Sequence, residues 1–186
     1  MHERGSTDTT ALAGSLLLAH PSLKDDNFRH SVILMSAHDA NGAMGVVLNR
    51  PLGKTLGQLS PDFALGPLSG VPIYKGGPVQ TEQLLLCGWK LHEDGSGFQL
   101  MFGIDPEKAT ELLSEPHVQL RAFLGYSGWT GGQLEGELQQ NAWVVSPLVS
   151  GVLEAEQDET LWKSILGGMS DEWRLLVNEP EDPSLN

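Results

Sequence analysis

Apolar runs bounded by glycine, proline and asparagine recur along the chain at strand length, which predicts a β-rich protein. Two of them, "SVILMSA" (31–37) and "AMGVVLN" (43–49), flank the segment "HDANG". In that segment Asp39, Asn41 and Gly42 suit a tight turn, because these residue types tolerate left-handed backbone angles. The pattern therefore predicts a β-hairpin.

Another apolar run, "ALAGSLLLAHP" (11–21), has the length of a signal-peptide core. The polar leader before it carries Glu3 and Asp8 against Arg4, whereas a signal peptide begins with net positive charge. We therefore expect this run to form a buried strand. Five further strands are predicted at "PIYKGG" (72–77), "QLLLCGWKL" (83–91), "GFQLMFGI" (97–104), "VQLRAFLGY" (118–126) and "NAWVVSP" (141–147).

Helix signals are fewer and come late in the chain. In "DPEKATELLS" (105–114) Asp105 suits the N-cap and Pro106 the first helical position. In "TGGQLEGELQQN" (130–141) Thr130 and Gln133 have the spacing of a capping box. Two more helices are predicted at "ETLWKSILGG" (159–168) and "SDEWRLLV" (170–177). Strands followed by helices favour an α+β, or irregular α/β, fold over a doubly wound parallel sheet.

The length of 186 residues fits one domain, which we place at 11–178. The polar segment 1–10 and the acidic segment 179–186 are predicted to be disordered tails, because neither has an apolar period. The stretch 60–72, rich in proline and glycine, is predicted to be a long surface connection.

Charge and cysteine content narrow the function classes. The formal net charge is −13, and nine of the 24 acidic residues follow position 153. This charge opposes the binding of nucleic acid. Cys87 is the single cysteine and lies in an apolar run, so we expect a buried, inert thiol and a cytoplasmic protein. No apolar stretch reaches the ~18 residues of a membrane span.

Three blocks of sequence, in this order, resemble the AlgH/YqgE family of bacterial proteins. They are "GSLLLAHPSLKDDNFRHSVILMSAHDANGAMGVVLNRPL" (14–52), "YKGGPV" (74–79) and "GYSGWTGGQLEGELQQNAWVVSP" (125–147). The resemblance implies a branched, barrel-like, mainly antiparallel sheet with helices packed on it. It also implies an association with transcriptional regulation, without an established reaction. The family pattern has arginine where His30 stands, which weakens an anion-binding role for that position.

The residues that resemble catalytic machinery do not form a convincing set. "GYSGW" is similar to the nucleophile elbow G-x-S-x-G, but its fifth position is Trp129 and the predicted helix starts too late for a nucleophile at Ser127. The histidines are scattered and lack the spacing of a metal site. We therefore predict neither a catalytic residue nor a metal site, and no cofactor.

The candidate binding residues lie in the family blocks. Glycine turns can present backbone N–H groups to an anion. The predicted hairpin can bring Arg29 and Arg50 near each other at one end of the sheet, where they would form an anion-binding or partner-docking edge. Simple tight turns, solvated charges and core aromatics are the alternatives to a binding role. The candidates for ligand or partner binding are Arg29, His38, Asn49, Arg50, Lys75, Gly76, Gly77, Trp129, Thr130 and Gly131.

Three functional hypotheses follow. The first is a noncatalytic binding or regulatory protein that recognises a protein partner or a small anionic ligand through a surface built from the three blocks. The second is a hydrolase-like enzyme with a site at the glycine turns and His38. The third is direct DNA binding, which the net charge and the lack of a helix-turn-helix or basic arm oppose.

Overall fold

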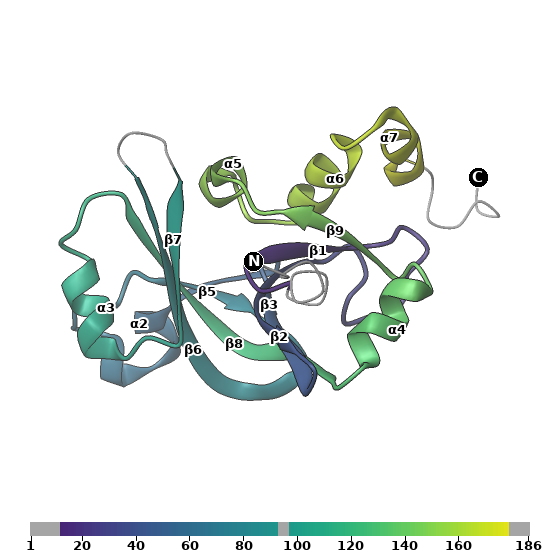
Figure 1. Cartoon of the computed structure of the whole chain (residues 1–186). Coiled ribbons are helices and arrows are strands. Elements are labelled where there is room, and N and C mark those ends of the chain that lie inside the picture. The colour runs from purple at the N-terminus through teal and green to yellow at the C-terminus, as the bar shows by residue number, and fades with distance from the viewer. Residues whose placement is uncertain (1–11, 93–96, 179–186) are drawn as a thin grey trace, which may run out of the picture.

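The structure, a computed structural model, describes residues 12–92 and 97–178 (Figure 1). The predicted tails at 1–10 and 179–186 lie outside the described residues. The assignment of 11–178 to one domain stays a prediction.

Nine strands of the described chain form one mainly antiparallel sheet. They are β1 (Ser15–Ala19), β2 (Val32–Asp39), β3 (Gly42–Val47), β4 (Pro51–Thr55), β5 (Pro72–Lys75), β6 (Val79–Leu91), β7 (Phe98–Phe102), β8 (Val118–Thr130) and β9 (Trp143–Pro147). The main path runs β4-β5-β8-β3-β2-β1-β9, and β6 and β7 branch from it at β8. The predicted hairpin is confirmed as β2 and β3, and the apolar run near the N-terminus is confirmed as the buried strand β1.

The sheet branches because β8 is long and bends at Gly125, where φ is 74°. Before the bend β8 pairs with β5 and with most of β6, and after it β8 pairs with Val79 at the start of β6 and with β3. A Cβ atom on Gly76 would lie 2.3 Å from the Gly125 carbonyl oxygen, so only glycine permits this crossing of the two chain segments. The α+β class and the branched sheet are confirmed, and the sheet does not close into a barrel.

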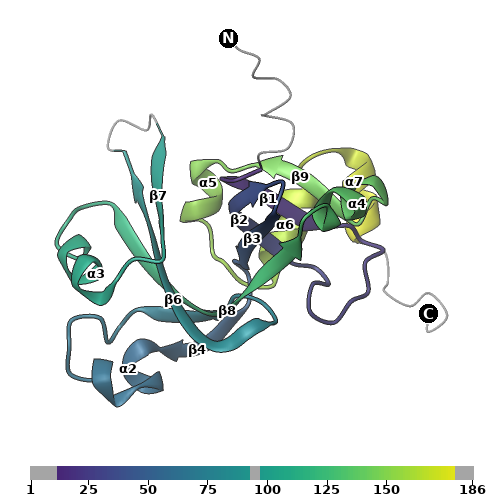
Figure 2. The same cartoon turned by 60° about the horizontal axis from the view of Figure 1, so that its bottom comes forward.

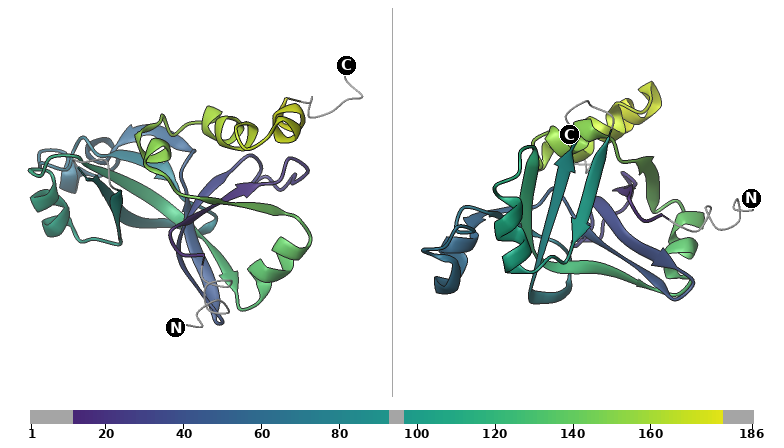
Figure 3. Two further views of the ribbon diagram at one scale, coloured as in Figure 1. Left: turned by 45° about the horizontal axis from the view of Figure 1, so that its top comes forward. Right: turned by 60° about the vertical axis from the view of Figure 1, so that its left-hand side comes forward.

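Six α-helices in the described residues cover the two ends of the sheet. They are α2 (Leu56–Leu59), α3 (Pro106–Leu112), α4 (Gln133–Gln139), α5 (Ser150–Glu154), α6 (Thr160–Gly167) and α7 (Asp171–Val177), and a short 3₁₀ helix spans Pro61–Phe63. The helices α2 and α3 lie at the β5–β8 end, whereas α4 to α7 lie around β1 and β9 (Figures 2 and 3). The predicted caps of α3 and α7 are confirmed, since Asp105 accepts the Lys108 N–H and Ser170 the Trp173 N–H.

The buried apolar residues form three clusters, which lie beneath α5 to α7, beneath α2 and α3, and beneath α4. The largest includes Leu34, Trp89 and Trp162 and lies beneath α5 to α7. A second cluster lies beneath α2 and α3, and a third lies beneath α4 around Met35 and Leu134. Cys87 belongs to the largest cluster, and burial raises the pKa of its thiol to about 12, as expected for an inert cysteine.

Two predictions about the segment 125–138 are wrong. β8 does not end at Tyr126 in a glycine turn, because it continues to Thr130 and pairs with β3 from Ser127 onward. Thr130 is therefore the last strand residue, and Gly132, with φ of 83°, is the N-cap of α4. The Gln133 side chain still accepts the Thr130 N–H at 3.0 Å. One of the two bonds of the expected capping box is therefore present. Because Thr130 belongs to β8 and Gln133 to α4, this bond links the strand to the helix.

Candidate functional site

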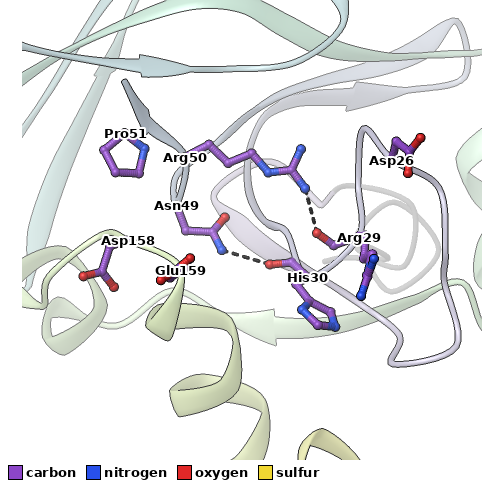
Figure 4. A pocket seen from close by; sticks show the side chains of 8 residues that line it. All are labelled: Asp26, Arg29, His30, Asn49, Arg50, Pro51, Asp158 and Glu159. Atoms are coloured by element: carbon purple, nitrogen blue, oxygen red, sulfur yellow. Dashed lines mark hydrogen bonds between the residues drawn. The ribbon is translucent and has the colours of Figure 1, made fainter. Parts of the chain in front are cut away.

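The structure places five of the ten candidate residues in two separate regions. The first region, named here the arginine cleft, is a cavity of about 780 Å³. It is lined by Asp26, Arg29, His30, Asn49, Arg50, Pro51, Asp158 and Glu159 (Figure 4). Three of the ten predicted site residues, Arg29, Asn49 and Arg50, therefore meet in one place.

Arg50 lies between β3 and β4 and reaches across to the loop that precedes β2. Its guanidinium donates hydrogen bonds to the carbonyl oxygens of Asn27 and Arg29, the latter at 2.6 Å. Burial lowers the pKa of Arg50, and the charge of Asp25 opposes that shift. Arg50 has no ion pair among the described residues, so two carbonyl oxygens accept hydrogen bonds from its Nη1 and Nη2 atoms without neutralising its charge. These two bonds use only part of the five N–H groups of the guanidinium.

The buried side chain of Asn49 also anchors the loop that precedes β2. This side chain accepts the Val32 N–H at 2.9 Å and donates to the His30 carbonyl oxygen at 2.9 Å. These two bonds tie the end of β3 to the start of β2. They also fix the backbone at His30, whose φ of 57° is in the left-handed region that non-glycine residues rarely occupy.

The His30 ring stacks on Trp162 of α6, with the centroids 4.0 Å apart and the planes 12° from parallel. The pKa of His30 is lowered, first by burial and then by positive charges, of which those of Arg29 and Lys24 are the largest. Positive charges therefore surround His30 on a protein of net charge −13, although Asp26, Asp158 and Glu159 also line the cleft. Sequence reasoning missed the contribution of Trp162, Asp158 and Glu159, because they come from a helix more than a hundred positions away along the chain.

The second region, named here the motif groove, is an open cavity of about 550 Å³ over β3 and the end of β8. It is lined by Ala37, Asp39, residues 41–44, Val79, Tyr126, residues 128–130 and Gln133. Parts of all three family blocks therefore meet at this groove. Of the predicted site residues, only Trp129 and Thr130 line it.

Trp129 is a core residue with one edge at the groove. It is 6% exposed, and its indole N–H donates to the Glu137 carboxylate at 2.9 Å. The Trp143 indole donates to the same oxygen at 2.8 Å, and Phe28 stacks on Trp129. Packing in the core therefore explains Trp129 without a binding role. Glu137 links α4 to the indoles of Trp129 and Trp143.

The remaining glycine candidates serve chain packing. The Gly76 N–H donates to the Leu124 carbonyl oxygen, and the Gly76 carbonyl accepts the Val47 N–H and the Ser127 hydroxyl. These backbone groups are therefore engaged within the sheet. Lys75 is an exposed residue of β5, Gly77 packs on the backbone of Tyr126, and Gly131 packs on the Ala40 carbonyl.

The groups of the hydrolase hypothesis are buried and already paired. The Ser127 side chain is fully buried and donates to the Gly76 carbonyl oxygen. The His38 side chain is 1% exposed, and its Nδ1 accepts the Leu12 N–H. Its Nε2 therefore carries the hydrogen and donates to Glu135 at 2.8 Å, which holds the pKa of that carboxyl below its ordinary value. Neither ring nitrogen is left to act as a base.

The described residues contain neither a metal-site arrangement nor a helix that could span a membrane. Over residues 12–92 and 97–178, no group of three or more His, Cys, Asp or Glu side chains has the arrangement of a metal site. Within the same ranges, none of the helices combines the length and apolar character needed to cross a membrane.

Comparison of the sequence with known proteins gives matches along almost the whole chain. The family model described as AlgH-like matches residues 16–174. A UPF0301 protein of Streptomyces coelicolor is 35% identical over 198 residues, covering 98% of this chain and 99% of the relative. A UPF0301 protein of Streptomyces avermitilis is 36% identical over 193 residues, with the same coverage of 98% and 99%.

Solved structures give the same result. The solution structure of the AlgH protein from Pseudomonas aeruginosa matches with a TM-score of 0.65 and 30% identity, covering 97% of this chain and 98% of that one. The crystal structure of a Corynebacterium diphtheriae protein has a TM-score of 0.69 at 24% identity, with coverage of 90% and 92%. The second likeness concerns the fold alone.

Proposed function

We propose that this chain, which belongs to the AlgH-like family, is a noncatalytic binding protein whose arginine cleft takes a small anionic ligand. The observation that carries the proposal is the state of Arg50. Its partly buried guanidinium bonds to two backbone carbonyls and has no carboxylate partner among the described residues. An anionic group in the cleft would balance that charge and accept charge-assisted hydrogen bonds.

The rest of the cleft supports the same proposal. Asn49 and Arg50 hold the loop 27–30 in place without a ligand, so little ordering is required when one binds. A volume of about 780 Å³ lies within the usual range of small-molecule sites. The buried, paired states of Ser127 and His38 favour binding over hydrolysis.

We also propose that the protein acts in the cytoplasm and has a regulatory role through a protein partner. A lone buried cysteine fits action in the cytoplasm. The resemblance to AlgH links the family to transcription, and a net charge of −13 favours an effect through a protein partner over direct contact with DNA. Measurable binding to random duplex DNA at ~0.15 M salt, lost when Arg29 and Arg50 are replaced, would overturn this choice.

Anion binding is tested by NMR titration of the ¹⁵N-labelled full chain with inorganic phosphate and with caproate at constant ionic strength. We expect the largest shifts at the amides of residues 29–32, 49 and 50. Arg50→Gln should weaken binding by about tenfold, because a charge-assisted hydrogen bond in a partly buried site contributes about 1.5 kcal/mol or more.

Two variants control for side effects. Lys54→Gln makes the same change of net charge at an exposed residue of β4 outside the cleft, and should leave affinity unchanged. Arg50→Lys keeps the charge but loses the planar fork, and should give an intermediate affinity. Shifts centred elsewhere, or equal affinity in Arg50→Gln and Lys54→Gln, would refute the proposed site.

A further inference from the structure

The arginine cleft carries positive and negative side chains on facing parts of its wall. The Arg29 and Arg50 cations come from the loop before β2 and from the segment between β3 and β4, and the carboxylates of Asp158 and Glu159 come from the two residues before α6. Figure 4 shows the Arg50 guanidinium directed toward the Arg29 carbonyl and away from the two carboxylates. Opposite charges thus share one cavity.

These charges do not neutralise each other across the cavity. Within the described residues, neither Arg50 nor Glu159 has an ion pair, and the Glu159 carboxylate has no hydrogen bond. Asp158 differs from Glu159, because its carboxylate accepts the Thr160 N–H and hydroxyl at the start of α6. Asp26 also lines the cleft, but it belongs to the same loop as Arg29, so Glu159 is the acidic group opposite the arginines that a ligand can engage without breaking a bond of the protein (Figure 4).

We infer that the arginine cleft takes a ligand that carries an anionic group and an ammonium group together, as an amino acid does. This inference rests on the proposed anion site and adds its ligand class. The anionic group pairs with the arginine side, and the ammonium group pairs with Glu159. The same carboxylate repels a ligand of high negative charge, so it also disfavours polyphosphates and nucleic acid.

The test compares ligands that differ only in the amine. The ¹⁵N-labelled full chain is titrated with γ-aminobutyrate and butyrate, ε-aminocaproate and caproate, and glutamate and glutarate. These pairs vary the distance between the two charges. In at least one pair, the amine should strengthen binding by about fivefold, the gain from one partly exposed ion pair of about 1 kcal/mol.

The Glu159→Gln variant assigns that gain to one residue. It should remove the preference for the amine while the plain carboxylates bind as tightly as before or more tightly. Glu159 makes no side-chain cap to α6, so the variant should fold normally. Glu156→Gln is the matched control, since it removes an exposed carboxylate outside the cleft, and it should keep the preference.

The outcomes separate this inference from the proposed function. If phosphate and carboxylates bind but no amine strengthens binding, the ligand class is wrong and the anion site stands. If the gain survives in Glu159→Gln, the pairing of the ammonium group with Glu159 is wrong, and another carboxylate of the cleft such as Asp26 provides it. If neither the carboxylates nor phosphate bind in the cleft, the proposed function fails, and this inference fails with it.

Discussion

The arginine cleft and the motif groove lie at opposite ends of the same strand, and they are built in different ways. The groove lies around the start of β3 at Gly42, and the cleft follows the end of β3 at Asn49 and Arg50. The groove obtains its shape from glycine backbones and buried indoles. The cleft obtains its shape from polar side chains that hold a loop.

This difference separates residues required by the fold from residues available for binding. At the groove, the glycines are explained by close backbone contacts, and Trp129 by its bond to Glu137. At the cleft, the charges of Arg50 and Glu159 have no ion-pair partner within the described residues. The family-like blocks therefore contain both framework residues, such as Gly42 and Trp129, and candidate binding groups, such as Arg50, whereas Glu159 lies outside them.

The largest expected effect is at the groove. In Gly42→Ala the new Cβ atom would lie 2.4 Å from the Trp129 carbonyl oxygen, and φ is 145°. The pairing of β3 with β8 would have to open, so we expect a loss of about 3 kcal/mol in the free energy of unfolding, measured in urea. The control Gly136→Ala adds a Cβ with no atom within 4 Å in α4, and should stabilise by about 0.5 kcal/mol. Equal stability of the two variants would contradict the steric account of the groove.

Asn49→Ala tests the framework of the cleft. It leaves the Val32 N–H and the His30 carbonyl oxygen without their side-chain partner, and should cost about 2 kcal/mol of unfolding free energy. Anion affinity should fall as well, because the loop that presents Arg29 is released. Asn178→Ala loses one exposed hydrogen bond to Arg174 and should change stability by less than about 0.5 kcal/mol. Unchanged anion affinity in a destabilised Asn49→Ala variant would mean that the bridge serves only the fold.

Glu137 provides a smaller test of the groove. Glu137→Ala leaves the indole N–H groups of Trp129 and Trp143 without their acceptor, and should cost about 1.5 kcal/mol. The tryptophan fluorescence should change with it. Glu137→Gln keeps an oxygen acceptor and should recover most of this stability. Anion binding in the cleft should stay unchanged in both variants, and a loss of binding would show that the two regions are coupled.

Local patterns in the sequence predicted much of the fold. The hairpin of β2 and β3 and the caps at Asp105 and Ser170 depend on residues close in sequence, and the structure confirms them. β4 was missed, because it is a short, exposed strand that begins at Pro51 and lacks an apolar run. The end of β8 was misassigned, because glycine marks a bend and close strand packing there as well as it marks a turn.

The candidate site was predicted only in part, for a related reason. Arg29 and Arg50 were expected to meet because they flank one hairpin, and they line one cleft. Glu159 and the stacking of His30 on Trp162 depend on how α6 packs against the sheet. That packing follows from the apolar face of the helix and the shape of the whole core, which no local pattern specifies.

The smallest expected effect is a pH dependence of anion binding that has no counterpart at the groove. Burial and the nearby cations lower the pKa of His30, so in the free protein it is mostly neutral at pH 7. A bound anion favours the protonated ring and raises that pKa. Affinity for caproate should therefore rise by about two- to threefold as the pH falls from about 7.5 to about 5.5, a range in which caproate stays ionised. NMR titrations at several pH values measure this change.

Two variants of His30 test the origin of the pH dependence. His30→Gln should remove the pH dependence, and His30→Arg should remove it and bind caproate at least as tightly as the native chain does at low pH. An affinity that falls with decreasing pH would show that His30 does not contribute positive charge to the bound anion.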